Sequence, residues 1–153
     1  MDKEKFWKFS PWLTRLLLLP PTTIFTLIAT RYLAHPVASA AEQGITLNSG
    51  LGVTIARVGF GGFPLASAVF VATCLLSRQR LLTGLSFVWI LDAVVLTVRV
   101  IGMNLDSTVQ ANMKLVNAEI GLLFITSIGL FLELRRRAFF RRTYPAINQT
   151  RAA

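Results

Sequence analysis

The stretch LLTGLSFVWILDAVVLTVRVIGM, residues 81–103, decides the fold. It is long enough to cross the hydrocarbon core of a bilayer, about 30 Å thick, which takes roughly 20 helical residues. Three more apolar segments of this kind occur at about residues 12–32, 53–76 and 113–134. A backbone in lipid must satisfy its own hydrogen bonds, and these segments lack the alternation of barrel strands. The sequence therefore predicts an all-α, integral membrane four-helix bundle.

The composition favours a membrane protein over a soluble domain. Of the 153 residues, 54% are hydrophobic and only 15% are charged, so polar groups are too few to cover the apolar part in water. The net charge is +9, and the basic residues lie mainly between the apolar segments and at the chain ends. Neither a Gly-rich phosphate loop nor an RNA-binding aromatic signature accompanies it. We therefore expect no nucleic-acid partner.

The positions of the basic residues predict the orientation, because positive flanks stay on the cytoplasmic side of a membrane. They gather at the start of the chain, in the second connection and in the tail: Lys3, Lys5, Lys8, Arg15, Arg78, Arg80, Arg135, Arg136, Arg137, Arg141, Arg142 and Arg151. The other two connections hold only Arg31 and Lys114. We expect both ends in the cytoplasm, with residues 1–11 as an interfacial segment, 12–134 as the four-helix domain and 135–153 as a basic tail. Such a surface attracts anionic membrane lipid.

The connections also carry structural predictions. Residues 77–80 form a tight hairpin that makes the second and third helices antiparallel neighbours. The long outer connection, residues 33–52, is expected to contain a short surface helix near residues 37–43.

The first apolar segment has a second interpretation, as a cleaved signal peptide. Residues 38–40, Ala-Ser-Ala, resemble a cleavage site after a basic start and an apolar stretch. Against cleavage, Pro20-Pro21 interrupts the apolar run, and Arg31 and His35 lie before the would-be site. An uncleaved first helix would be kinked at the two prolines. Cleavage would leave three helices and an outside N-terminus.

The chain has one cysteine, Cys74, and one histidine, His35. These are too few for an internal disulfide, a multi-ligand metal site or a bis-histidine heme. We expect Cys74 to be an inert packing residue and no cofactor site to be built by this chain alone. No nucleophile–base pair is visible either, so an enzyme is the least favoured class.

Four charged residues lie inside the predicted helices, where each costs about 2.5–3.5 kcal/mol at the bilayer centre. They are Arg57, Asp92, Arg99 and Glu119. At a rise of about 1.5 Å per residue, Arg57, Arg99 and Glu119 have similar depths near the outer helix ends. We expect these three to form one ion cluster. Asp92 lies two turns from Arg99 on the same helix face and should point to the middle of the bundle.

Two patterns predict which helix faces pack against protein. A polar stripe recurs every seven residues in the last segment and should face inward: Asn112, Glu119, Thr126 and Glu133. Small residues in the second segment should let a neighbouring backbone approach closely: Gly59, Gly61 and Gly62.

The ion cluster allows two main interpretations. As a buried network it would organise the bundle of a non-enzymatic membrane protein, either free-standing or an accessory subunit among other membrane subunits. As a pocket open toward the outer leaflet it would bind a quinone or a lipid and assist a redox system, with Phe63, Phe87 and Trp89 as an apolar wall. A proton relay through Asp92 and Glu119 is a third alternative, which lacks a repeated ladder of charges.

The order of these features resembles a family of small bacterial four-helix membrane proteins of unknown function, related to the DoxX-like group. The resemblance spans most of residues 30–137. It rests on residues 57–62, RVGFGG, similar to an Arg-x-x-x-Gly-Gly opening of helix two, and on the basic hairpin leading through residues 78–85. Arg99 resembles the family's arginine late in helix three, and Glu119 its glutamate early in helix four.

The resemblance implies a bundle in the bacterial plasma membrane, with DoxX-type relatives linked to quinone or thiol redox systems. It implies no established reaction. The chain departs from the family pattern at Pro20-Pro21, at Pro64 and in its aromatic and basic N-terminus. Such additions would suit contacts with a partner in a larger membrane complex.

Overall fold

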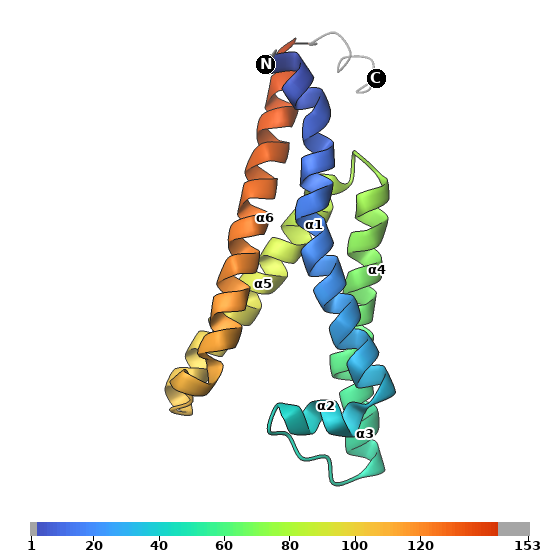
Figure 1. Cartoon of the computed structure of the whole chain (residues 1–153), viewed down its shortest axis with the longest axis vertical. Helices are drawn as coiled ribbons and strands as arrows, with labels where there is room; N and C mark the ends of the chain where they lie inside the picture. Colours follow the sequence, from blue (N-terminus) through green and yellow to red (C-terminus); the bar gives the residue numbers. More distant parts are fainter. Residues whose placement is uncertain (1–2, 144–153) are drawn as a thin grey trace, which may run out of the picture.

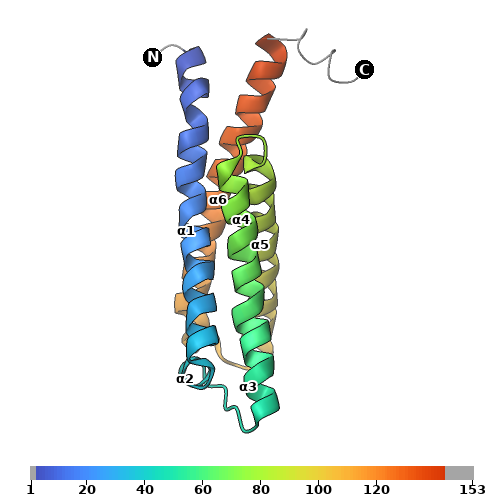
Figure 2. The same ribbon diagram turned by 90° about the vertical axis from the view of Figure 1, so that its right-hand side faces the viewer.

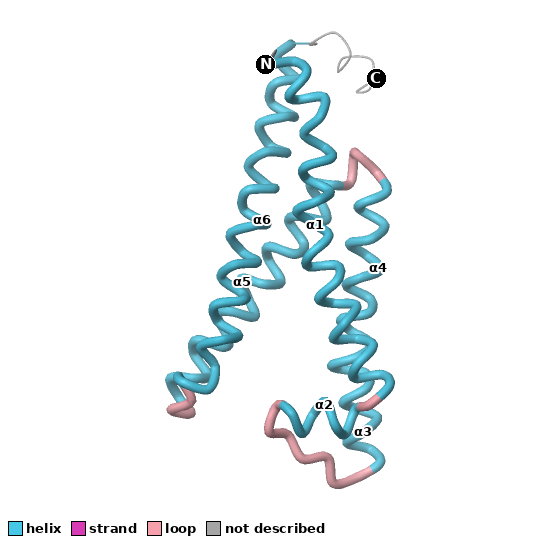
Figure 3. The backbone as a smooth tube through the Cα atoms, viewed as in Figure 1, coloured by secondary structure: helices cyan, strands magenta, loops and turns pink. Residues whose placement is uncertain are grey.

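A computed structural model describes residues 3–143, and every regular element in that range is helical. The elements are α1 (Lys3–Ala34), α2 (Pro36–Glu42), α3 (Gly50–Ala56), the π-helix η1 (Arg57–Gly62), α4 (Phe63–Leu76), α5 (Leu81–Leu105) and α6 (Val109–Thr143). Helices long and apolar enough to cross a membrane span Glu4–Ala34, Gly50–Leu76, Leu81–Leu105 and Val109–Thr143. The predicted all-α architecture with four long apolar helices is therefore confirmed, as is the short helix α2 in the long connection (Figure 3).

The first and last long helices, α1 and α6, are longer than the apolar segments in the sequence indicate. α1 and α6 contain 32 and 35 residues, about 48 and 52 Å of helix. α1 runs without a break through the residues expected to form a separate interfacial segment, and α6 continues past residue 134 to Thr143. The rings of Trp7 and Phe139 stack with their centroids 6.1 Å apart, so these two extensions support each other. Residues 144–153 of the predicted tail lie outside the described range.

The bundle consists of two helix pairs. α1 packs along η1 and α4, α5 packs along α6, and α1 also contacts α6. Figures 1 and 2 show the start of α1 and the end of α6 at one end of the molecule, with α2 and α3 at the other. In Figure 1 the two pairs lie close together near the α4–α5 hairpin and diverge toward the end that carries α2 and α3.

The buried core lies near the hairpin, where the two pairs meet. Its fully buried members are Leu18, Val71, Leu81, Leu85 and Val88. Glycines permit close approach there: a Cβ on Gly129 would lie 2.6 Å from Leu85 Cδ2, and one on Gly84 would lie 2.8 Å from Cys74 Cβ. The buried Cys74 thus packs at the crossing of α4 and α5.

The π-helix has a local cause. Pro64 has no backbone N–H, so the carbonyl of Phe60 lacks its ordinary α-helical donor. The chain widens by one residue per turn, and the backbone N–H of Phe63 donates to the carbonyl of Val58 five residues earlier. The widened turn packs against α1, because a Cβ on Gly61 would lie 3.0 Å from Leu33 Cδ2.

Candidate functional site

Arg99 of α5 and Glu119 of α6 form an ion pair in the half of the bundle away from the hairpin. Arg99 Nε lies 2.8 and 3.0 Å from the two carboxylate oxygens of Glu119, and Arg99 Nη2 lies 2.7 Å from Glu119 Oε1. The side chains are only 27% and 14% exposed. A short connection after α5, with Ser107 in the left-handed region at φ 54°, turns the chain so that the two residues face each other.

Asn112 completes this arrangement. Arg99 Nη1 donates to Asn112 Oδ1 at 3.2 Å, and Asn112 Nδ2 donates to the carbonyl of Thr108 at 3.1 Å. The guanidinium of Arg99 is therefore held by two residues of α6. Charge-assisted bonds of this kind are stronger than neutral ones and fix the geometry of a planar guanidinium.

A cavity of about 320 Å³ lies beside the Arg99–Glu119 pair, between the two helix pairs. All four long helices contribute to its wall, which is mainly aliphatic and aromatic: Ile24, Phe25, Ile28, Phe63, Pro64, Leu91, Val95, Leu115, Ala118 and Leu122. Its polar lining residues are Ser67, Asp92, Arg99 and Glu119. A small apolar cavity with a few polar groups is the usual form of a ligand site.

Asp92 is the buried charge of this cavity. It is 7% exposed, lines the cavity from α5, and its Oδ2 atom has no hydrogen-bond partner within the described residues 3–143. Asp92 thus lies in the interior of the bundle, on the same helix as Arg99 but two turns nearer the hairpin. A buried polar atom without a partner is uncommon and costs free energy, so it requires a physical explanation.

The structure does not bring Arg57 to this pair. Arg57 is an exposed residue of η1, it is not among the cavity residues, and no ion pair or hydrogen bond of its side chain occurs within residues 3–143. Depth along a helix does not determine the direction in which a side chain points. η1 packs chiefly on α1, α3 and α4, while Arg99 and Glu119 belong to the other helix pair.

Of the other residues predicted for the site, some line the cavity and others lie elsewhere. Phe63 lines the cavity, but the indole N–H of Trp89 donates to Ser127 Oγ at 3.0 Å and Phe87 packs against Phe70. Of the three glycines of the RVGFGG motif, only Gly61 is buried at a helix crossing. A Cβ on Gly59 would meet nothing within 4 Å, and one on Gly62 would meet only the carbonyl of Arg57 at 3.9 Å.

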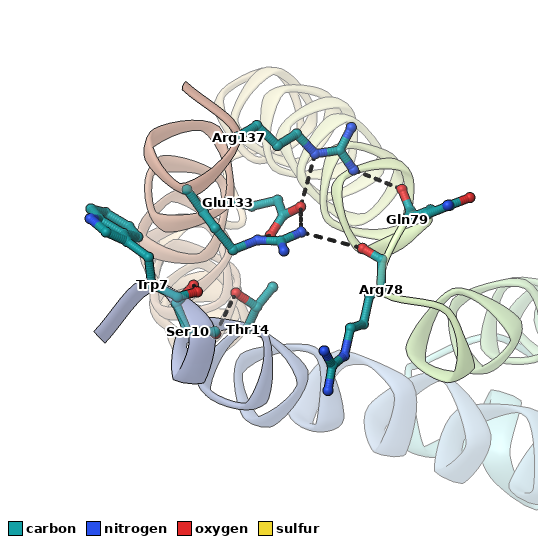
Figure 4. Close-up of polar contacts among 8 residues, drawn as sticks. Trp7, Ser10, Thr14, Arg78, Gln79, Glu133 and Arg137 are labelled. Carbon is teal, nitrogen blue, oxygen red and sulfur yellow. Dashed lines mark hydrogen bonds and ion pairs between the residues drawn. The ribbon is translucent and has the colours of Figure 1, made fainter. Parts of the chain in front are cut away.

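A second polar site, at the hairpin end, was not singled out from the sequence. Glu133 of α6 is completely buried, and Arg136 and Arg137 bind its carboxylate at 2.6–2.9 Å. The same arginines donate to the hairpin carbonyls of Arg78 and Gln79 at 3.5 and 2.7 Å (Figure 4). We call these five residues the hairpin clasp.

The hairpin clasp belongs to the predicted polar stripe. Thr126 and Glu133 are fully buried, while Asn112 and Glu119 are partly buried, so the stripe faces the bundle. The available signal was the spacing of Glu133 from the arginines three and four residues later. The sequence favours a role for those arginines in topology and in attracting anionic lipid, and backbone carbonyl acceptors in a hairpin leave no mark in a sequence.

From α1, Arg15 also reaches the hairpin end, where its Nε donates to the carbonyl of Leu75 at 2.9 Å. Ser10 and Thr14 of the same helix are buried. The hydroxyl of Thr14 donates to the carbonyl of Ser10 at 3.1 Å (Figure 4). Arginines of α1 and α6 therefore donate to backbone carbonyls at the end of α4 and in the hairpin that follows it.

Within the described range, no group of three or more His, Cys, Asp or Glu side chains could hold a metal ion. No protein-family model matches the chain, and no significant match to a curated protein or a solved structure was found. The resemblance to the DoxX-like group stays a prediction. Four long apolar helices are compatible with a polytopic membrane protein.

Proposed function

We propose that this chain is a non-enzymatic, multi-pass protein of a bacterial plasma membrane that binds a small amphipathic molecule, such as a lipid or a quinone, between its two helix pairs. The observation that carries the proposal is the cavity of about 320 Å³ beside the Arg99–Glu119 pair. Its volume lies at the lower end of the range for small-molecule sites, roughly 300–1,000 Å³.

The composition of the wall supports an amphipathic occupant. Its side chains are apolar along most of the lining, with the polar groups on α5, α6 and Ser67 of α4. The apolar body of a ligand would contact the apolar lining, and its polar head would contact the polar groups. The pair of charges also ties α5 to α6, so the same residues support the organisation of the bundle.

The proposed orientation puts the start of α1, the α4–α5 hairpin and the end of α6 on the cytoplasmic side. Support comes from the basic residues Lys5, Lys8, Arg78, Arg80 and Arg141, which belong to these three segments. Arg99 lies about 27 Å along α5 from the hairpin, so the ion pair would be in the outer half of the membrane.

Reporter fusions test this orientation. A reporter after Arg151 is expected to be cytoplasmic, and one inserted near Gly44 is expected to be outside. A reporter near Gly44 that reads as cytoplasmic would overturn the proposed orientation.

Native mass spectrometry after gentle extraction tests ligand binding. The wild-type protein is expected to retain a bound small molecule. Ala118→Trp fills the cavity and should remove it. Ile120→Trp is the matched control, because Ile120 lies two residues away on α6, is exposed and does not line the cavity. Wild-type protein without any adduct, or equal adducts in the two variants, would argue against the proposal.

A second candidate function is an accessory subunit of a larger membrane complex. The observation that favours it is Arg57, a charge inside a candidate span that is exposed and has no ion-pair partner in the described part of the chain. A carboxylate on a neighbouring subunit would offset the cost of that charge. Co-purification in mild detergent that Arg57→Ala abolishes would support this function, and a single small species with wild-type protein would contradict it.

A further inference from the structure

The unpartnered Asp92 narrows the class of ligand. Its carboxylate lies on the wall of the cavity, 93% of the residue is removed from solvent, and nothing in residues 3–143 donates a hydrogen bond to it. The cost of leaving a buried acceptor unsatisfied is avoided when a ligand supplies the donor. An apolar residue at position 92 would have no unsatisfied acceptor, so it would avoid this cost in the absence of a ligand.

The polar groups around the cavity are otherwise engaged. Arg99 gives its Nε and Nη2 to Glu119 and its Nη1 to Asn112. The hydroxyl of Ser67, which lines the cavity from α4, donates to the carbonyl of Phe63 at 3.0 Å. The α1 side of the cavity is lined by aliphatic and aromatic side chains. No hydrogen bond from any of these side chains to Asp92 occurs among residues 3–143.

The charges of the lining have the sign that a cation requires. Asp92 and Glu119 are acidic and Arg99 is basic, so one carboxylate remains after Arg99 and Glu119 neutralise each other. The remaining charge is that of Asp92, about 10 Å along α5 from Arg99. Opposite charges attract more strongly beside apolar side chains of low dielectric constant than in bulk water.

We propose that the cavity binds a lipophilic amine, whose protonated head donates a hydrogen bond to the Asp92 carboxylate while its apolar body contacts Phe25, Phe63 and Leu122. This inference rests on the proposed ligand-binding function and specifies its ligand. An amine-bearing lipid and a free lipophilic amine share this chemistry. The carbonyl oxygens of a quinone are acceptors only and give nothing to a carboxylate.

The probe is 4-phenylbutylamine, titrated by calorimetry into the full chain in phosphatidylglycerol nanodiscs, with empty nanodiscs subtracted. Asp92→Asn is expected to weaken binding about 10–100-fold, the loss typical of a charged hydrogen bond. Asp106→Asn is the matched control, because Asp106 is an exposed acid at the end of the same helix and outside the cavity. The control is expected to bind as the wild type does.

The neutral isostere 4-phenylbutan-1-ol separates charge from shape. It should bind the wild type more weakly than the amine and respond little to Asp92→Asn. Equal affinities of amine and alcohol for the wild type would overturn the amine proposal, even if Asp92→Asn does not fold. Unchanged amine binding in a folded Asp92→Asn variant would overturn it as well.

Two further experiments distinguish a lipid amine from a free amine, and the amine proposal from the proposed ligand-binding function. Phosphatidylethanolamine added to the nanodiscs should compete with the probe if a lipid head is the natural donor, and leave its affinity unchanged if a free amine is. Ala118→Trp should abolish binding of both amine and alcohol. If it does so while Asp92→Asn has no effect, the cavity binds ligands but the amine assignment is wrong. If Ala118→Trp has no effect on either compound, both proposals fail.

Discussion

The hairpin clasp and the Arg99–Glu119 site are built on the same face of α6, two seven-residue repeats apart, yet they differ in how completely their carboxylates are satisfied. Glu133 is fully buried between two arginines that continue to hairpin carbonyls. Glu119 is paired with one arginine beside a cavity, and the neighbouring Asp92 has no partner among the described residues. The polar network at the hairpin is satisfied, whereas the one at the cavity leaves Asp92 Oδ2 without a partner among residues 3–143.

The difference follows from the packing of the helix pairs. Near the hairpin, Gly84 and Gly129 let the helices approach, and large aliphatic side chains fill the core. Toward α2 and α3 the pairs diverge (Figure 1), and the cavity lies between them. Complete packing stabilises a fold, whereas a cavity with an unsatisfied acceptor costs stability and is typical of a binding site.

The largest expected effect is at the hairpin clasp. Glu133→Gln removes the carboxylate from two arginines and should lower the free energy of unfolding by about 3–5 kcal/mol. Equilibrium unfolding in detergent micelles measures it. Glu42→Gln is the control, because its pair with Arg31 is exposed, and exposed ion pairs contribute about 0.2–1 kcal/mol. Equal effects of the two substitutions would contradict the structural role of the clasp.

A smaller loss is expected at the cavity. Glu119→Gln should destabilise the protein by about 1.5–3 kcal/mol, because its partner Arg99 keeps Asn112 and is partly exposed. The same unfolding series measures it. A loss larger than that of Glu133→Gln would reverse the ranking of the two regions.

The glycine contacts give a finer test of close packing near the hairpin. Gly129→Ala should be less stable than Gly121→Ala by about 1–3 kcal/mol, the usual cost of overpacking. Both substitutions gain the same helix propensity, but a Cβ on Gly121 would meet nothing within 4 Å. Thermal unfolding of the two variants provides the comparison, and identical stabilities would show that Leu85 moves aside freely.

The long apolar helices were predictable from sequence because length and composition alone define them. The ends of α1 and α6 were not, because Trp7 and Phe139 become partners only in the folded chain. A polar, aromatic segment such as residues 3–11 is compatible with an interfacial position and with a helix that extends beyond the membrane. In the structure α1 continues through these residues, and Trp7 contacts Phe139 of α6.

The site was predictable in part. Seven-residue spacing identified the polar stripe of α6, and similar depth brought Arg99 and Glu119 into one hypothesis. Depth is one coordinate, however, and the lateral position of Arg57 depends on which helices pair, which the sequence does not specify. The cavity and the unpartnered atom of Asp92 depend on side-chain packing and have no sequence signature.

The central claim is that the buried carboxylate of Glu133 stabilises the fold, whereas that of Asp92 binds a ligand. Its most direct test is the free energy of unfolding of Glu133→Leu and Asp92→Leu, measured in delipidated protein under the same conditions. Glu133→Leu should lose about 3–5 kcal/mol, because two arginines lose their carboxylate. Asp92→Leu should gain about 1–3 kcal/mol, because the unsatisfied acceptor is removed. A loss of stability in Asp92→Leu comparable to that in Glu133→Leu would contradict the account.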